Sequence, residues 1–467
     1  MNKFFKISER GSNVRTEIIA GLTTFFAMAY ILVVNPNQIT GFTSFDVPGV
    51  GKIWNAVYIA TIIASVIGTL LYALYAKLPF AQSCGMGLNS FFFTSFVLPQ
   101  VLSGGDVISG YQTGLVIILV SGLVFLVLSI TGARSYIAKA MPDCIKKAIP
   151  AGIGLFIAFI GFQNVGIVQD NPYTLVQFVK LQGVTWAEVA PAVVALFGFL
   201  VIAILTKLKV KGSVLLGILV TSVVYYLSTW TKPDFTMAAI LDPFKDFAEI
   251  GITGVFKAES WTNAFSGEML GGIFSAIMLI VTFCLVDMFD TIGTLYGTAS
   301  EADMLDENGD PIDVEKAMTC DSVATVAGAV CGTSTVTTFV ESASGVAAGG
   351  RTGLTSLVVS ICFALCLFLS PVASIIPSAA TAPALIFVGV LMLKNFGKVD
   401  MEDMRSAVPA FLTLVMMPLT YSIANGIGIG AIAYVLITLF TGKYTKKDIA
   451  VTIIALLFIF KFVFGTI

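Results

Sequence analysis

Long apolar runs separated by short polar breaks dominate the chain. Runs near the roughly 20 residues that cross a bilayer as a helix recur from Ile18 to Phe464. Backbone polar groups in lipid must be bonded within their own segment, so long runs without alternation predict helices rather than a barrel. In the first half of the chain we place seven spans, near residues 16–38, 54–76, 83–98, 110–131, 145–168, 188–206 and 212–230.

A second set of seven runs follows a polar stretch. That stretch, from Thr231 to Gly267, follows directly on Trp230 and contains Trp261, and it predicts an external loop with interfacial aromatic residues. The spans after it lie near residues 269–297, 317–332, 334–347, 354–370, 378–395, 406–422 and 426–441. The chain is therefore expected to be an all-α polytopic membrane protein with 14 transmembrane spans.

Seven spans per half predict an inverted repeat, because an odd number of crossings turns the second copy upside down. Cys84-Gly85 opens the third span and Cys331-Gly332 opens the tenth, the equivalent place in the second copy. Both spans are short and begin with Gly or hydroxyl residues, which indicates half-helices at a binding site. The expected division is a first repeat at 1–230, an external linker at 231–268, a second repeat at 269–441 and a C-terminal apolar segment at 442–467, whose topology the pattern leaves open.

Composition and charge agree with a membrane protein and give its orientation. Hydrophobic residues make up 57% of the chain and charged residues 12%, whereas a soluble domain carries about 25% charged residues. Most of the 26 Lys and Arg, such as Lys146, Lys207 and Arg405, fall in loops that share a side with the N-terminus. We therefore expect a multi-pass protein of the plasma membrane with a cytoplasmic N-terminus. The net charge of −2 gives no sign of a nucleic-acid partner.

Acidic residues inside apolar spans are the candidate chemistry. Asp287 and Asp290 lie in the eighth span and Glu341 in the tenth. Each is costly against lipid, so each is expected to face protein or water and to mark a site. Residues three apart share a helix face, so Asp287 and Asp290 should repel, and one should be protonated near neutral pH. Because the chain contains no His, any proton that it carries is expected to bind these carboxylates.

The short third and tenth spans supply polar groups and flat apolar surface near these acids. Glycines such as Gly87 allow an extended segment before a helix begins, with free backbone amides at its start. Asn89 adds an amide that both donates and accepts, and Phe91, Phe92 and Phe339 offer aromatic rings. A planar ring with polar edges would fit such a site, although core or lipid packing is the favoured explanation for most of the 37 Phe.

Four segments together resemble one transporter family. They are Thr16 to Pro36, Gly85 to Asn89, Asp287 to Gly293 and Gly332 to Gly345. They are similar to the nucleobase:cation symporter-2 superfamily, in particular its azaguanine-resistance-like branch of hypoxanthine, guanine and adenine permeases. The resemblance implies a core domain of spans 1–4 and 8–11 that moves against a gate domain, with the substrate between them.

The resemblance also assigns roles to residues. It implies that Asp290 and Glu341 hydrogen-bond the base, and that Asn89 and Asp287 shape purine binding. Uracil-type relatives can carry a histidine at the position of Thr294, so its absence places proton coupling on Asp290, Asp287 and Glu341. Further substrate-binding candidates in the two short spans are Gly87, Thr338, Phe339 and Ser342.

The leading hypothesis is a secondary transporter that imports purine nucleobases by proton symport and alternating access, with guanine and hypoxanthine favoured over adenine. No catalysis, cofactor or metal is required, and a homodimer is left open. One alternative is an anion transporter of the same architecture, in which facing helix starts bind sulfate or a carboxylate. Another is an intramembrane aspartyl protease built on Asp287 or Asp290, which the lack of a Gly-x-Gly-Asp segment disfavours.

Overall fold

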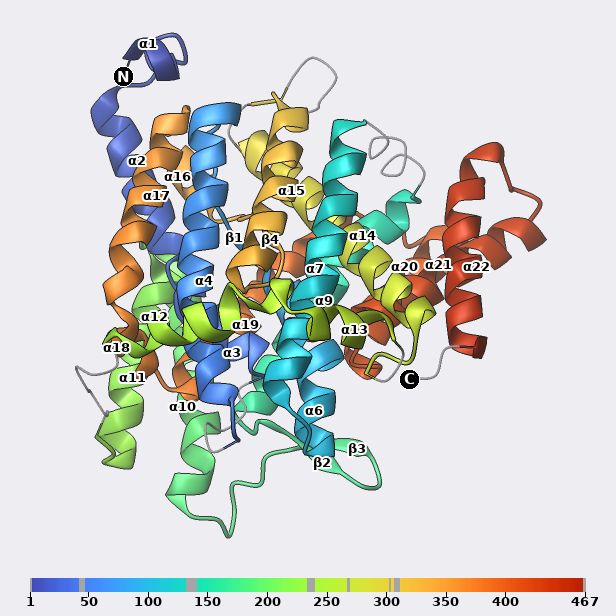
Figure 1. The fold of residues 1–467 in the computed structure, drawn as a ribbon, viewed down its shortest axis with the longest axis horizontal. Helices are drawn as coiled ribbons and strands as arrows, with labels where there is room; N and C mark the ends of the chain where they lie inside the picture. The colour runs from blue at the N-terminus through green and yellow to red at the C-terminus, as the bar shows by residue number, and fades with distance from the viewer. Residues whose placement is uncertain are drawn as a thin grey trace.

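The computed structural model is a mostly helical bundle whose long helices run side by side (Figure 1). It describes residues 2–41, 47–131, 141–232, 240–266, 269–301, 304–305 and 311–464. Eight of the described helices are long and apolar enough to cross a membrane, and four shorter apolar helices accompany them. The polytopic membrane fold is thus confirmed in its class, while the count of 14 spans stays a prediction.

The first half of the chain contains most of the long helices. Its elements are α1 (Asn2–Phe5), α2 (Val14–Met28), α3 (Ile31–Ile39), α4 (Val50–Leu71), η1 (Tyr72–Ala76), β1 (Gln82–Cys84), α5 (Met86–Phe92), η2 (Phe93–Val97), α6 (Leu98–Ser103), α7 (Val107–Ile130), α9 (Asp143–Asn164), β2 (Val168–Asn171), β3 (Leu175–Phe178), α10 (Trp186–Lys207) and α11 (Ser213–Thr229).

The second half contains more short helical elements and breaks, together with one helix of 29 residues. Its elements are α12 (Asp242–Asp246), η4 (Phe247–Gly251), η5 (Gly254–Phe256), α13 (Ala258–Phe265), α14 (Ile273–Glu301), α15 (Val314–Cys331), β4 (Val336–Thr338), α16 (Ser342–Ala347), α17 (Gly353–Leu365), η6 (Cys366–Phe368), α18 (Ser370–Ser374), α19 (Ser378–Met392), η7 (Leu393–Lys398), α20 (Met404–Leu419), α21 (Ile423–Phe440), η8 (Lys446–Asp448) and α22 (Ile449–Phe464).

The strands correct the all-α prediction. β1 pairs with β4 and β2 pairs with β3, each pair antiparallel. The β1–β4 pair lies within the bundle, and its residues are buried. An extended segment there has no helical bonds, so its backbone groups need partners from another segment. Two short extended segments that pair with each other meet this need.

The linker expected as a loop is also partly helical. From α12 to α13 the chain forms four short helical elements that run across the bundle (Figure 1). They pack against α4 and α7, and Lys52 on α4 forms a 2.9 Å ion pair with Glu249. Nearby, Asn55 donates to the Asp246 carboxylate at 2.8 Å. The linker is therefore bound to two long helices.

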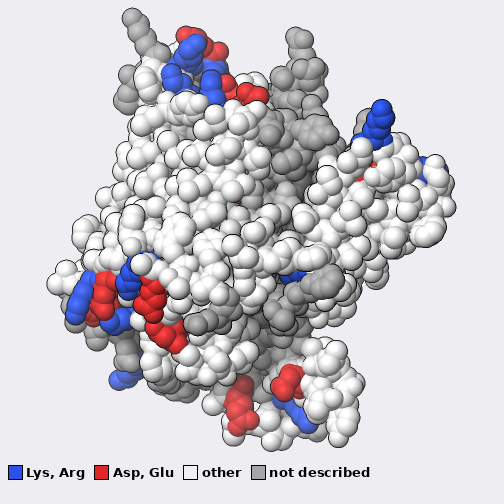
Figure 2. Space-filling model, turned by 45° about the vertical axis from the view of Figure 1, so that its right-hand side comes forward, with Lys and Arg blue, Asp and Glu red and all other residues white. Residues whose placement is uncertain are grey.

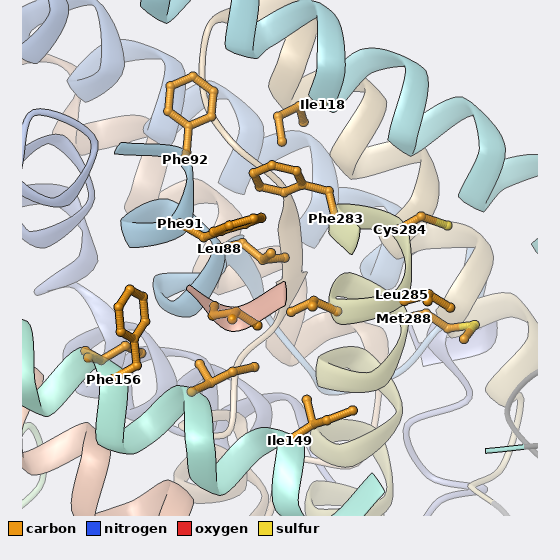
Figure 3. Packing of buried hydrophobic residues seen from close by; sticks show 14 of the residues in the cluster. Leu88, Phe91, Phe92, Ile118, Ile149, Phe156, Phe283, Cys284, Leu285 and Met288 are labelled. Atoms are coloured by element: carbon orange, nitrogen blue, oxygen red, sulfur yellow. The ribbon is translucent and has the colours of Figure 1, made fainter. Parts of the chain in front are cut away.

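The helices pack in two groups. In one group α2, α4, α7, α14, α15, α16 and α17 contact one another, and in the other α9, α10, α11, α19, α20 and α21 do so. Contacts of α9 with α14 and of α11 with α2 join the groups, and α5 also contacts α9. Ile149 and Phe156 of α9 belong to the same apolar core cluster as Leu88 of α5, and Figure 3 shows them in the same region of the bundle. Apolar packing therefore forms much of the boundary between the two groups.

One carboxylate ties α2 to the start of α17. Glu17 is fully buried and accepts hydrogen bonds from the backbone N–H of Arg351 at 2.9 Å, the Thr352 hydroxyl at 2.9 Å and the Thr355 hydroxyl at 2.6 Å. Thr352 in turn caps α17, because its hydroxyl accepts from the Leu354 N–H. A buried acid with several donors needs no cation to remain in place.

Charged side chains are unevenly distributed over the surface of the protein. In the view of Figure 2, Lys, Arg, Asp and Glu form separate patches at the top, on the lower left side, at the right and at the bottom, and uncharged residues cover most of the remaining surface that is described. Broad uncharged areas of this kind are typical of a protein that faces lipid.

Candidate functional site

The β1–β4 pair forms the centre of the candidate site. Its register places Gln82 opposite Thr338 and Cys84 opposite Val336. Two further backbone bonds extend it, from Gly85 N to Thr335 O and from Phe339 N to Ala81 O, both 3.0 Å long. Each strand is followed by a short helix, α5 after β1 and α16 after β4. The pair thus joins the third and tenth predicted spans by their backbones.

Asp290 and Glu341 come together beside this strand pair. Asp290 lies on α14, and its Oδ2 is 3.8 Å from the position that a Cβ on Gly85 would occupy. Glu341 stands at the N-cap of α16, between β4 and the helix. The two carboxylates are close enough to interact electrostatically, and each residue as a whole is partly exposed. The structure places these two acids in one region, and their role in binding a substrate stays a prediction.

The two oxygens of Glu341 differ in their surroundings. Oε1 accepts a hydrogen bond from the Tyr30 hydroxyl at 2.5 Å. Oε2 is buried and has no hydrogen-bond partner within the described part of the chain. A buried acceptor without a partner costs about 1–3 kcal/mol, so a bound donor at Oε2 would be strongly favoured.

Asp287 has different neighbours from Asp290. It is 1% exposed, and its Oδ2 accepts from the Thr325 hydroxyl of α15 at 2.9 Å. Its Oδ1 is buried without a partner among the described residues. Although the two acids are one helical turn apart, Asp287 is bonded to α15, whereas Asp290 lies beside Gly85 and near Glu341.

A further buried acid, Asp321 on α15, escaped the sequence reasoning. Its carboxylate accepts from Tyr72 at 2.9 Å, from Thr291 at 2.7 Å, from Gln82, and from the Thr338 hydroxyl and N–H at 3.1–3.3 Å. It therefore joins η1, β1, β4 and α14. Asp321 and Thr325 share a helix face, a polar stripe that could have revealed it.

Three predicted binding residues already have protein partners. Asn89 accepts from the Ser334 hydroxyl and donates to Gln38 Oε1 at 3.2 Å. The Thr338 hydroxyl bonds to the Asp321 carboxylate and to Tyr72, and the Ser342 hydroxyl accepts from the Ala81 N–H at 3.0 Å. In this arrangement their side chains hold the strand pair together, and a direct role at the substrate stays a prediction.

The apolar candidates line different parts of the bundle. Phe339 is 4% exposed and belongs to a core cluster with Trp54 and Phe363. Gly87 lies so close to α9 that an added Cβ would be 2.2 Å from Ile153 Cγ2. Phe91 packs against Phe283 with ring centroids 4.8 Å apart, as Figure 3 shows.

Phe92 points elsewhere. Its ring packs against Phe96 and Tyr111, on the side of α7, and in Figure 3 it extends away from Phe91. Of the two adjacent phenylalanines, the ring of Phe91 is therefore the one that lies toward α14.

The electrostatics of the region are those of acids without basic partners. Asp287, Asp290, Asp321 and Glu341 take part in none of the ion pairs found among the described residues. Their partners are hydroxyl, amide and backbone N–H groups. Such a site suits a neutral ligand that offers N–H donors, or a proton, better than a bare anion.

Comparison with known proteins identifies relatives along the whole chain. The model of the permease family Xan_ur_permease matches residues 15–429. The guanine/hypoxanthine permease PbuG of Bacillus subtilis is 41% identical over 467 residues, which cover 99% of this chain and 100% of that protein. The adenine permease AdeP of Escherichia coli is 37% identical, with 99% of this chain and 96% of that protein covered. A putative permease of Methanocaldococcus jannaschii is 38% identical, with 99% and 98% covered.

Solved structures of lower sequence identity share the fold. The transmembrane domain of the cyanobacterial bicarbonate transporter BicA aligns with a TM-score of 0.61 at 13% identity, over 88% of this chain and 97% of that one. The anion transporter SLC26A9 of the mouse aligns with a TM-score of 0.57 at 12% identity, over 91% and 68%. At these identities the likeness concerns the architecture alone.

Proposed function

Because the chain belongs to the permease family whose model spans residues 15–429, we propose that it carries purine nucleobases across the membrane and binds them at Glu341 and Asp290. It is a multi-pass membrane transporter and not an enzyme. Relatives at 35–41% identity named as guanine/hypoxanthine or adenine permeases support the substrate class. The intramembrane protease is therefore set aside.

The observation that carries the binding proposal is the unpartnered Oε2 of Glu341 beside Asp290. A purine offers ring N–H groups and, in some bases, an exocyclic amino group, and a carboxylate accepts from both. A base that lacks the matching donor would leave this buried acceptor unpaired, at a cost of about 1–3 kcal/mol. The same penalty supplies selectivity between nucleobases, with 6-oxopurines favoured over adenine.

The test is nucleobase uptake by a Glu341→Gln variant. Replacing Oε2 or Oε1 by an NH2 group removes an acceptor and adds a donor, so we expect uptake of labelled guanine and hypoxanthine to be abolished. Glu249→Gln is the matched control, because Glu249 is an exposed residue of the linker and the chemical change is the same. Normal purine uptake by a correctly inserted Glu341→Gln protein would remove Glu341 from the site.

The coupling ion is proposed to be a proton held by Asp290 or Asp287. Support comes from the absence of His in the chain and from the lack of basic partners at either acid among the described residues. An Asp290→Asn variant should bind purine more weakly and lose the pH dependence of uptake. An unchanged pH profile excludes Asp290 from coupling, and sodium-driven uptake that resists a protonophore excludes the proton.

The transport cycle is proposed to follow alternating access between the two helix groups. In this reading the group containing α2 and α14 is the core domain and the group containing α9 and α19 is the gate domain. The segments β1–α5 and β4–α16 are the half-helices of spans 3 and 10 in a 7+7 repeat. The gate would close over a base held at the β1–β4 pair, in a plasma-membrane protein with a cytoplasmic N-terminus.

An anion transporter remains the second candidate, favoured only by the shared fold with a bicarbonate transporter. Two carboxylates that interact at the site oppose it, since an anion would add a third negative charge. Competition of labelled guanine with unlabelled purines and with sulfate separates the two functions. Inhibition by sulfate and not by purines would favour the anion.

A further inference from the structure

Among the described residues, Tyr30 is the one whose side chain forms a hydrogen bond to the carboxylate of Glu341. Its hydroxyl donates to Oε1 at 2.5 Å, and its side chain is 1% exposed. Sequence reasoning had no reason to select it, because Tyr30 lies in an apolar run and is 311 residues away from Glu341. A bond of this length to a carboxylate belongs to the stronger class of hydrogen bonds.

We propose that Tyr30 is a positioning residue. Its hydroxyl occupies Oε1 of Glu341 by a hydrogen bond, so that Oε2 is the oxygen that accepts a hydrogen bond from the N–H of the substrate. This inference rests on the proposed nucleobase function and names a determinant of its specificity. Tyr30 acts through Glu341 and needs no contact with the base. Without it, the carboxylate could rotate, and both oxygens would be free to accept.

The backbone around Tyr30 keeps the hydroxyl in place. Tyr30 lies between α2 and α3, and its carbonyl accepts from the N–H groups of Val33 and Val34, both at 3.1 Å. Its ring belongs to the large core cluster together with Val34 and Ile39. A ring fixed on both sides holds its hydroxyl in one direction at low entropic cost.

The same geometry predicts a preference between bases. Hypoxanthine presents one ring N–H on the edge that carries its carbonyl, whereas guanine presents that N–H next to an amino group. A carboxylate with both oxygens free pairs best with two adjacent donors. A carboxylate whose Oε1 already accepts a hydrogen bond from Tyr30 pairs best with a single donor. Removing the Tyr30 hydroxyl should therefore weaken hypoxanthine binding more than guanine binding.

The experiment compares Tyr30→Phe with Tyr58→Phe in the full-length protein reconstituted in liposomes. Tyr58 is the matched control, because it is also 1% exposed and its hydroxyl donates to a backbone carbonyl, that of Cys366, at 2.9 Å. KM and the maximal rate are measured for labelled hypoxanthine and guanine. A hydrogen bond to a charged group corresponds to a change of about ten-fold or more, so we expect KM for hypoxanthine to rise about ten-fold in Tyr30→Phe. We expect a smaller rise for guanine, maximal rates within about two-fold, and no such change in Tyr58→Phe.

The outcomes separate this inference from the function on which it rests. If the wild type takes up neither base, the proposed function and the proposed role of Tyr30 are both refuted. If the wild type and Tyr58→Phe transport purines and Tyr30→Phe has the same KM values and base preference as they have, only the role of Tyr30 falls.

A second variant covers the case in which Tyr30→Phe does not reach the membrane. Incorporating 3-fluorotyrosine at position 30 keeps the ring and the hydroxyl and makes the hydroxyl a stronger donor. A changed ratio of the KM values for the two bases supports the positioning role, and an unchanged ratio overturns it.

Discussion

Replacing Asp321 by Asn should loosen the strand pair at the centre of the bundle. The carboxylate is fully buried and accepts from Tyr72, Gln82, Thr291 and Thr338. The Gln82 amide donates to Oδ1 and the Thr338 N–H donates to Oδ2, so an NH2 group in place of either oxygen would face a donor. The change preserves side-chain volume, so the loss would come from hydrogen bonding and not from a cavity.

The contacts give the size of the effect. If the NH2 group replaces Oδ2, the Thr338 N–H loses its acceptor, while Thr291 keeps a second partner in the Thr337 hydroxyl at 2.9 Å. Each buried donor without a partner costs about 1–3 kcal/mol. With one donor fully lost and one partly compensated, we expect the free energy of unfolding to fall by about 2–4 kcal/mol.

The assay is reversible unfolding of the purified protein in mixed micelles, with Asp313→Asn as the control. Asp313 precedes the same helix and pairs with Lys316 at the surface at 2.7 Å, an interaction worth about 0–1 kcal/mol. A loss in Asp321→Asn no larger than that in Asp313→Asn would refute the reasoning. It would mean that the carboxyl is already protonated and donates one of these bonds.

Three other changes test the close contacts of the bundle. Gly345→Ala should slow uptake and destabilise the protein by about 1–3 kcal/mol, measured by uptake and unfolding, because the new Cβ would lie 2.0 Å from Thr24 Oγ1. Glu17→Gln should lower the unfolding free energy by about 1–3 kcal/mol, since its carboxylate accepts several buried bonds, and an unchanged stability would contradict the network. Gly87→Ala should reduce uptake, and adding Ile153→Ala should restore part of it; failure of this rescue would show that the clash at 2.2 Å is not the cause.

Local patterns in the sequence predicted much of the bundle. Runs of apolar residues gave the helices to within a few residues, as for α10 at Trp186–Lys207 against an expected 188–206. The repeated Cys-Gly pair marked two short segments that the structure brings together, since Cys84 lies opposite Val336 in the strand pair. These features follow from hydropathy and from the needs of the backbone in lipid, which act over short stretches of chain.

Long-range contacts could not be predicted in the same way. The partners of Asp321 come from η1, β1, β4 and α14, and no spacing in the sequence relates these segments to α15. Tyr30 and Glu341 are 311 residues apart in the sequence, and only the fold brings them together. Asn89 and Thr338 were chosen for their polar groups, but whether a polar group faces a ligand or another residue depends on packing.

The strand pair has a consequence for the synthesis and membrane insertion of the protein. Gln82 to Cys84 enter the membrane early in synthesis, whereas their partners Val336 to Thr338 leave the ribosome only after most of the chain has been made. Until then, the extended segment cannot satisfy its backbone groups as it does in the finished molecule, and lipid offers no substitute. The insertion machinery, an adjacent early helix or retained water must therefore supply partners for the backbone groups of that segment while translation continues.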